Sequence, residues 1–150
     1  MLQTNILFVD EANSDRSILA EAYFNQGIAY SARAFSAGIA PADGLDRAVY
    51  DVMREKGIIP DDYCPKPIDI FLQPYSPRID LVVAFRPRGK VFKLPIVPYR
   101  PPMIDLLIDE VDGSLEGKAR KQAIRDCYAD VGLAIDRAKA KGLLPSSQAA

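Results

Sequence analysis

The sequence contains no histidine and has only two cysteines among its 150 residues. Without histidine, the chain cannot form a Ser-His-Asp or Cys-His catalytic pair, and it cannot form a histidine-ligated zinc site. Cys64 and Cys127 stand far apart and outside any Cys-x-x-Cys spacing, which excludes a disulfide framework and a four-thiolate zinc site. We therefore expect a protein of the reducing cytoplasm in which neither thiol is catalytic.

The sequence also lacks an excess of charge and a long hydrophobic run. Its 19 basic and 20 acidic residues leave a formal net charge of -1, which gives no general attraction for nucleic acid or anionic lipid. The first apolar run, residues 6–9, ends at Asp10 and is too short for a signal peptide or a membrane anchor. We expect neither a nucleic acid nor a membrane as a partner.

What is present is the alternation of strands and helices that is typical of an α/β domain. Short apolar stretches predict strands at 5–9, 30–36, 79–85 and 91–96, and helical spacing predicts helices at 16–27, 46–56 and 114–141. Ten of the 12 prolines lie between Pro60 and Pro102, so we expect no long helix there. The prediction is a doubly wound parallel four-stranded sheet flanked by helices, forming one domain over residues 1–142 with a disordered tail at 143–150.

The loop from Asp10 to Ser17 joins the first predicted strand to the first predicted helix, where a doubly wound sheet places its ligand crevice. Here the sequence resembles the low-molecular-weight protein tyrosine phosphatases and the thioredoxin-linked arsenate reductases. In those families an apolar strand is followed by Cys, five residues and Arg-Ser, usually with Asn at the third loop position. This chain has Asn13, Arg16 and Ser17 in place, but Asp10 stands where the cysteine belongs.

The resemblance extends over roughly residues 4–140. It includes the Ser-Ala-Gly motif at 36–38 with Pro41, the end of a helix at 52–58, a strand at 80–83 and Leu-Pro-Ile at 94–96. It implies that a cysteine thiolate attacks phosphorus or arsenic, that an arginine and backbone amides bind the oxyanion, and that an aspartate protonates the leaving group. The acid loop is expected at 98–101, which carries no carboxylate, and no resolving cysteine follows the third strand. We therefore expect no catalytic residues.

The acidic loop is expected to satisfy its own hydrogen-bonding groups instead of binding an anion. A helix N-terminus favours an anion by up to ~2 kcal/mol. A carboxylate at position 10 would repel it by about 4 kcal/mol at ~4 Å and an effective dielectric near 20. Glu11 and Asp15 would add to this repulsion. The prediction is that Asp10 accepts hydrogen bonds from Arg16 and from free amides at the helix start.

Two further features bear on this loop. No acidic residue occurs between residues 81 and 104. In the resembling fold this stretch borders the mouth of the loop, and its basic residues are predicted to form a rim there: Arg86, Arg88, Lys90, Lys93 and Arg100.

A different interpretation of the acidic loop is that Asp10, Glu11 and Asp15 hold magnesium or calcium. The loop matches no calcium-loop spacing, and Arg16 competes for the same oxygens, so we expect no metal and no other cofactor.

The sequence therefore predicts a catalytically inactive relative of these enzymes that acts as a binding or regulatory module for an unknown protein partner or small ligand. Its degenerate phosphate loop consists of Asp10, Glu11, Asn13, Asp15, Arg16 and Ser17. The alternatives are residual phosphatase or arsenate reductase activity, or metal-dependent hydrolysis of a phosphate ester at the acidic loop. A purely structural or oligomer-forming role is a further possibility.

Overall fold

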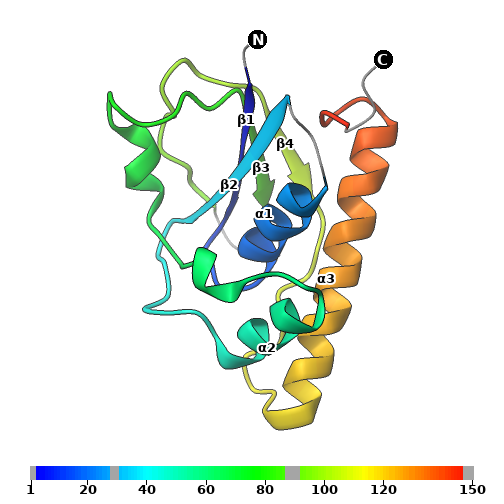
Figure 1. The fold of residues 1–150 in the computed structure, drawn as a ribbon. Helices are drawn as coiled ribbons and strands as arrows, with labels where there is room; N and C mark the ends of the chain where they lie inside the picture. The colour runs from blue at the N-terminus through cyan, green and yellow to red at the C-terminus, as the bar shows by residue number, and fades with distance from the viewer. Residues whose placement is uncertain (1–2, 28–30, 87–91, 147–150) are drawn as a thin grey trace.

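The computed structural model describes residues 3–27, 31–86 and 92–146 and contains a four-stranded parallel sheet with flanking helices (Figure 1). The elements, in chain order, are β1 (Thr4–Asp10), α1 (Arg16–Gln26), β2 (Ala32–Gly38), α2 (Arg47–Glu55), the 3-10 helices η1 (Pro60–Asp62) and η2 (Ile68–Leu72), β3 (Leu81–Phe85), β4 (Met103–Leu106) and α3 (Gly117–Ala140). The predicted α/β fold is confirmed. Within the described residues, no helix is long and apolar enough to cross a membrane.

The strand order is β2-β1-β3-β4, and every neighbouring pair is parallel. All four strands therefore end at the same edge of the sheet. The chain moves to opposite sides of β1 when it forms β2 and then β3, so the topological switch point lies at the end of β1. Asp10 is the last residue of β1 and pairs in register with Gly38, the last residue of β2. The loop that the sequence singled out thus begins at this switch point.

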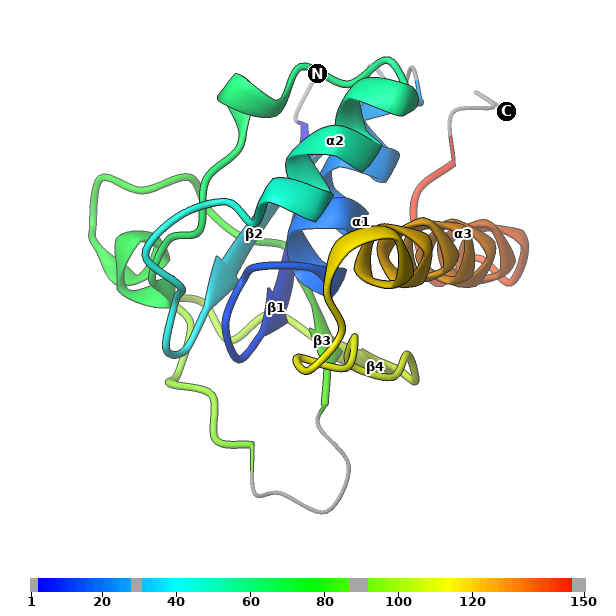
Figure 2. The same cartoon turned by 90° about the horizontal axis from the view of Figure 1, so that it is seen from below.

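β1 lies between β2 and β3, and its side chains are buried on both faces of the sheet. Residues 6–9 have no exposed surface, and alternate side chains enter different cores. Ile6 and Phe8 pack into a core shared with α1, α2 and α3, and Figure 2 shows these helices on one side of the sheet. Leu7 and Val9 enter a smaller core on the other face. A parallel strand that is covered on both faces reads as a continuous apolar run, which explains why the sequence predicted it.

The smaller core is covered by η2 and by an extended segment, not by a long helix. η2 contributes the buried side chains of Ile68 and Phe71 to this core, and the extended segment contributes that of Val97. This arrangement follows from the many prolines between residues 60 and 102, since each proline removes a backbone donor and disrupts a helix interior.

The prediction of the last strand at 91–96 is wrong for residues 92–96, and residue 91 lies outside the described residues. The fourth strand is β4, in which Met103 pairs with Val82 and Leu106 pairs with Phe85. A parallel neighbour of β3 must start at the amino end of the sheet, so the chain first has to cross back from the end of β3. Residues 92–102 make that return, and Phe92 and Leu94, which suggested a strand, pack against the smaller core instead.

The predicted disordered tail begins too early. Leu144 is only 3 % exposed and belongs to the core beneath the helices, and its backbone N–H and that of Leu143 donate to the Ala138 carbonyl. The ordered domain therefore extends beyond residue 142, and residues 147–150 lie outside the described part of the chain.

We expect Leu144→Ala to lower the free energy of unfolding by about 2 kcal/mol or more, because it leaves a cavity at a buried site. The neighbouring Leu143 is 50 % exposed, so Leu143→Ala should change the stability by less than about 0.5 kcal/mol. Urea unfolding followed by circular dichroism measures both variants. Equal stabilities of the two variants would show that Leu144 does not anchor the end of the chain.

Candidate functional site

The turn between β1 and α1 lies against the residues that follow β2. The amides of Ile39 and Ala40 donate to the carbonyls of Asp10 and Glu11, at 3.2 and 2.7 Å. Gly38 allows this approach, since a Cβ there would lie 2.8 Å from the Glu11 carbonyl oxygen. The glycine of the Ser-Ala-Gly motif therefore has a steric role in packing the loop.

The Asp10 carboxyl group points into the turn and is almost completely buried, with 1 % of the residue exposed. Its Oδ1 accepts hydrogen bonds from the Asn13 amide and the Ser17 hydroxyl, both at 2.7 Å. Its Oδ2 accepts the Ser17 amide at 3.2 Å. As the sequence predicted, Asp10 accepts from amides around the helix start. The predicted hydrogen bond from Arg16 is not formed, because its Nε lies 3.8 Å from Oδ2 and contributes only an ion pair.

Burial raises the pKa of the Asp10 carboxyl, and the nearby Asp15 adds to this effect. The hydrogen bonds from Ser17 and Asn13 and the charge of Arg16 act in the opposite direction. Desolvation is the largest of these influences, so the protonated carboxyl is favoured relative to an exposed aspartic acid. The group thus differs in its titration from a surface carboxylate.

Asn13 connects this turn to two other parts of the chain. Its backbone is in the left-handed region, at a φ of 50°, which asparagine tolerates better than most residues. Its side-chain amide donates to the hydroxyls of Ser17 and Ser36, at 2.8 and 2.9 Å. Its Oδ1 accepts the amide of Lys66 at 3.0 Å. Every polar atom of this fully buried side chain therefore has a protein partner.

A second buried carboxyl group, that of Glu21 on α1, continues the network. It accepts a hydrogen bond from the Ser36 hydroxyl at 2.5 Å and lies 3.5 Å from the Lys66 ammonium nitrogen. Burial raises the pKa of Glu21, although Lys66 and Ser36 oppose this effect. The sequence analysis did not identify Glu21 or Lys66, because neither belongs to a motif; Ser36 was part of one.

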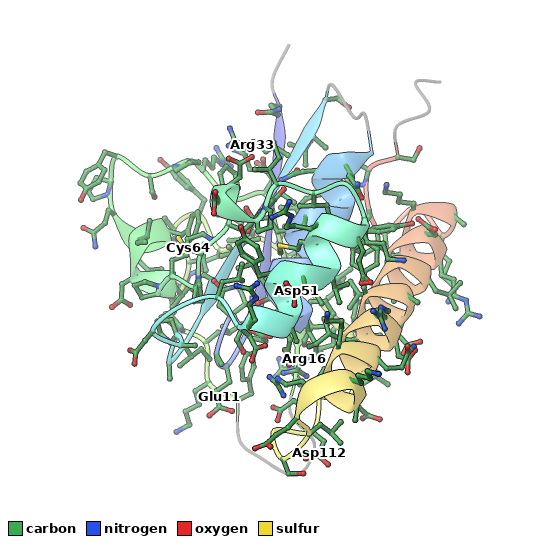
Figure 3. The ribbon with its side chains drawn as sticks, turned by 60° about the horizontal axis from the view of Figure 1, so that its bottom comes forward. Glu11, Arg16, Arg33, Asp51, Cys64 and Asp112 are labelled. Carbon is green, nitrogen blue, oxygen red and sulfur yellow. The ribbon has the colours of Figure 1, made fainter. Side chains whose placement is uncertain are left out.

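The Arg16 side chain extends away from the turn toward the segment between β4 and α3. Its Nη1 donates to the Ile108 carbonyl at 3.0 Å, and its Nη2 lies 3.4 Å from a carboxylate oxygen of Glu110. Arg16 is 2 % exposed, and within the described part of the chain its Nε has no hydrogen-bond partner. Figure 3 shows Arg16 at the same end of the molecule as Glu11 and Asp112, away from Arg33.

The acid-bearing segment expected at 98–101 requires a correction. Those residues precede β4 and therefore reach the amino edge of the sheet, opposite Asp10. The segment that leaves the carboxyl end of β4 contains Asp109, Glu110 and Asp112, and Glu110 reaches Arg16. The acid loop was expected at 98–101 because the last strand was predicted at the wrong position.

The acidic loop residues do not converge on a common point. Asp15 caps α1 by accepting the Arg16 amide, and its Oδ1 lies 3.8 Å from the Arg16 Nε. Glu11 is exposed. Over residues 3–27, 31–86 and 92–146, no group of three or more acidic or cysteine side chains is arranged to hold a metal ion.

The described residues of the predicted basic rim lie at different edges of the sheet. Arg86 follows β3 at the carboxyl edge of the sheet, where its Nε donates to Asp105 at 2.7 Å. Arg100 precedes β4 and lies at the other edge. Arg88, like Lys90, lies outside the described residues.

These features define a class of protein: a parallel α/β domain in which a turn joins the first strand to the first helix. A buried arginine stands at the start of that helix, and helix N-termini of this kind bind anions. The family model described as low molecular weight phosphotyrosine protein phosphatase matches residues 5–94. The chain therefore belongs to this family. A comparison with curated proteins finds no match.

Solved structures show the same fold. An arsenate reductase from Archaeoglobus fulgidus is 26 % identical, with a TM-score of 0.64 over 87 % of this chain and 98 % of that one. The YwlE arginine phosphatase from Geobacillus stearothermophilus is 22 % identical, with a TM-score of 0.66 over 92 % of both chains. The low molecular weight protein tyrosine phosphatase from T. tengcongensis is 19 % identical, with a TM-score of 0.58 over 90 % of this chain and 99 % of that one.

The raised pKa of Asp10 predicts how its contribution to stability depends on pH. The folded state binds this proton more tightly than the unfolded state, so the contribution of Asp10 falls as the pH rises from about 3.8 through its folded pKa. Asp10→Asn keeps an Oδ1 acceptor but cannot ionise. The free energy of unfolding of this variant, relative to the wild type, should therefore increase with pH in that window and then level off.

Urea unfolding at a series of pH values between about 3 and 8 measures this difference. Asp112→Asn is the control with the opposite sign, because hydrogen bonds from Ser114 lower the pKa of the exposed Asp112 carboxyl. Relative to the wild type, this control should lose stability as the pH rises toward about 3.8 and should stay constant above about 5. If the difference in unfolding free energy between Asp10→Asn and the wild type did not depend on pH, burial would not disfavour the ionised form of Asp10.

Proposed function

We propose that this protein is a non-catalytic member of its family that acts as a binding or regulatory module. One observation carries the proposal: the buried Asp10 carboxyl accepts the Asn13 amide, the Ser17 amide and the Ser17 hydroxyl. In the related enzymes, by the motif that this chain resembles, a cysteine stands at this position. Here a carboxyl group replaces the nucleophile and takes up donors at the helix start.

The position of Arg16 also supports the loss of catalysis. Its guanidinium donates to the Ile108 carbonyl and pairs with Glu110, so its charge is engaged within the chain. An incoming oxyanion would have to displace these contacts and approach Asp10. When Asp10 is ionised, it repels an anion charge at ~4 Å by about 4 kcal/mol at an effective dielectric of 20.

Reductase chemistry would need a set of reactive thiols, and the two cysteines of this chain do not form such a set. Cys127 is buried, and burial raises the pKa of its thiol to about 12, which leaves almost no thiolate at neutral pH. Cys64 is exposed. The state of the two thiols therefore supports a role without reductase activity.

Residual phosphatase activity remains the second candidate, because carboxylates do stand on the segment that follows β4. Glu110 lies 3.4 Å from Arg16 and could supply the proton that a leaving group needs. This activity would require a nucleophile other than a cysteine of the loop. The acidic loop shows no convergence of ligands that favours metal-dependent hydrolysis.

The proposal predicts no turnover of p-nitrophenyl phosphate or arsenate by the wild-type protein, with or without magnesium. The physical reason is the missing sulfur nucleophile and the carboxyl group in its place. A cysteine-bearing member of the family, assayed in parallel, gives the positive control. Clear turnover by the wild type that disappears in Asp10→Ala would refute the proposal.

Asp10→Cys tests whether the rest of the turn still supports chemistry. The Ser17 amide and hydroxyl now face Asp10 and would stabilise a thiolate in its place, as helix N-termini do. We expect hydrolysis of p-nitrophenyl phosphate by Asp10→Cys to exceed that of Asp10→Ser by about tenfold or more. Equal rates would implicate the missing general acid, Glu11 or Asp15 as a further obstacle to the reaction.

A further inference from the structure

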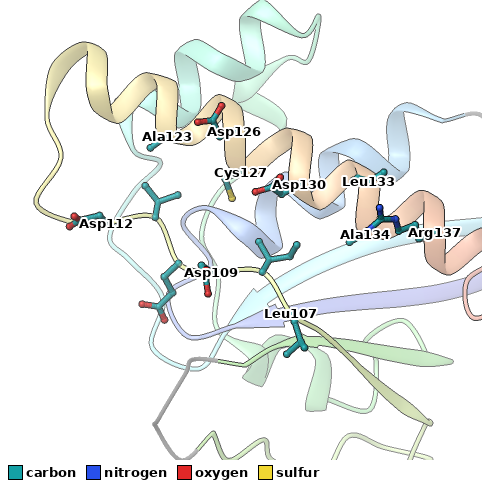
Figure 4. Close-up of a pocket in the computed structure, with 13 residues that line it drawn as sticks. Leu107, Asp109, Asp112, Ala123, Asp126, Cys127, Asp130, Leu133, Ala134 and Arg137 are labelled. Atoms are coloured by element: carbon teal, nitrogen blue, oxygen red, sulfur yellow. The ribbon is translucent and has the colours of Figure 1, made fainter.

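A groove lies between α3 and the segment that joins β4 to α3, outside the turn described above (Figure 4). Its volume is about 480 Å³, and none of residues 10–17 lines it. One wall consists of residues 107–112, and the other is formed by side chains of α3 between Ala123 and Arg137. A space of this size accommodates several side chains of a ligand.

The groove combines small floor residues with exposed leucines at its borders. Ala123, Cys127 and Ala134 of α3 leave room along the helix. Leu107 is 89 % exposed and Leu133 is 50 % exposed, and both line the groove. Exposed leucines that border a hollow provide apolar contact area for a ligand.

The charge of the groove is strongly one-sided. Among the described residues, its carboxylates belong to Asp109, Glu110, Asp112, Asp126 and Asp130, of which Glu110 is paired with Arg16, and the basic side chain that lines it is that of Arg137. Figure 4 shows Asp109 and Asp112 on one wall and Asp126 and Asp130 on the helical wall. The chain as a whole is nearly neutral, so this acidity is local. Such a surface repels phosphate groups and complements a basic partner.

The loop wall of the groove is held in place by Arg16. The Nη1 of this buried arginine donates to the Ile108 carbonyl, and its Nη2 pairs with Glu110. Ile108 and Val111 in turn pack against the core beneath the helices. A wall that is fixed before binding reduces the entropy lost when a partner docks.

We propose that this groove binds a basic amphipathic peptide segment of a partner protein. Arginine or lysine side chains of the segment would pair with the carboxylates, and its apolar side chains would contact Leu107 and Leu133. The apolar borders favour a peptide over a small polyamine, which offers charge without large apolar side chains. The inference rests on the proposed role as a binding module and adds the surface and the chemistry of the partner.

The test uses the full-length protein and a synthetic peptide of about twelve residues in which pairs of arginines alternate with pairs of leucines. Isothermal titration calorimetry should give saturable binding that weakens as salt is raised from about 50 to 500 mM. Amide resonances of residues 126–137 should shift in NMR spectra. The double variant Asp126→Asn/Asp130→Asn should weaken binding by about tenfold or more.

The matched control is Asp61→Asn/Asp62→Asn, which removes two exposed carboxylates from η1, an element that does not line the groove. Its affinity should stay within about twofold of the wild type. Leu133→Ser, and a peptide with serines in place of leucines, should each weaken binding. Thermal unfolding confirms that the variants are folded.

Three results would overturn the inference: no binding of the peptide, an equal loss of affinity in the η1 control, or binding of spermidine with the same affinity and the same resonance shifts. The turnover assays test the proposed function separately. Absence of both peptide binding and turnover would remove the groove as a docking site while leaving the non-catalytic role intact. Turnover together with specific peptide binding would refute the non-catalytic role and leave the groove as a docking site.

Discussion

The hydrogen bonds between the Asp10 carboxyl group and the start of α1 hold the candidate site together. They satisfy the amides of Asn13 and Ser17, which belong to the group of backbone donors that a strand-to-helix turn leaves unpaired. Each such donor would cost about 1–3 kcal/mol if it were buried without a partner. Asn13 then links the turn to Ser36 of β2. The carboxyl group thus does within the chain what a bound anion does at other helix N-termini.

Arg16 connects this turn to a different part of the surface. Asp10 satisfies donors of the turn, and the Arg16 guanidinium extends to the Ile108 carbonyl and Glu110. A residue that matches the oxyanion-binding arginine of the family motif therefore supports the wall of an acidic groove. In the proposed function, the family fold presents this groove as a protein-binding surface beside the turn in which Asp10 stands where the family motif has cysteine.

The accuracy of the sequence predictions depended on how much each segment is buried. β1 and α1 were predicted well, because a strand buried on both faces and a helix packed on it have clear apolar patterns. β4 was missed, because this four-residue edge strand has exposed side chains, whereas the nearby extended segment is more apolar. That error removed Asp109 and Glu110 from consideration. Glu21 was missed because its burial depends on contacts with β2.

The sequence by itself determined the α/β class, the family resemblance and the presence of Asp10 where the family motif has cysteine, since all three depend on residue types and local spacing. Only the tertiary structure decided where the Arg16 guanidinium points, which acidic segment it meets, and that α3 and the segment after β4 enclose a groove. The contacts of Arg16 join residues more than 90 positions apart in the chain. Their geometry follows from strand order and the long crossover, which no local pattern of side chains specifies.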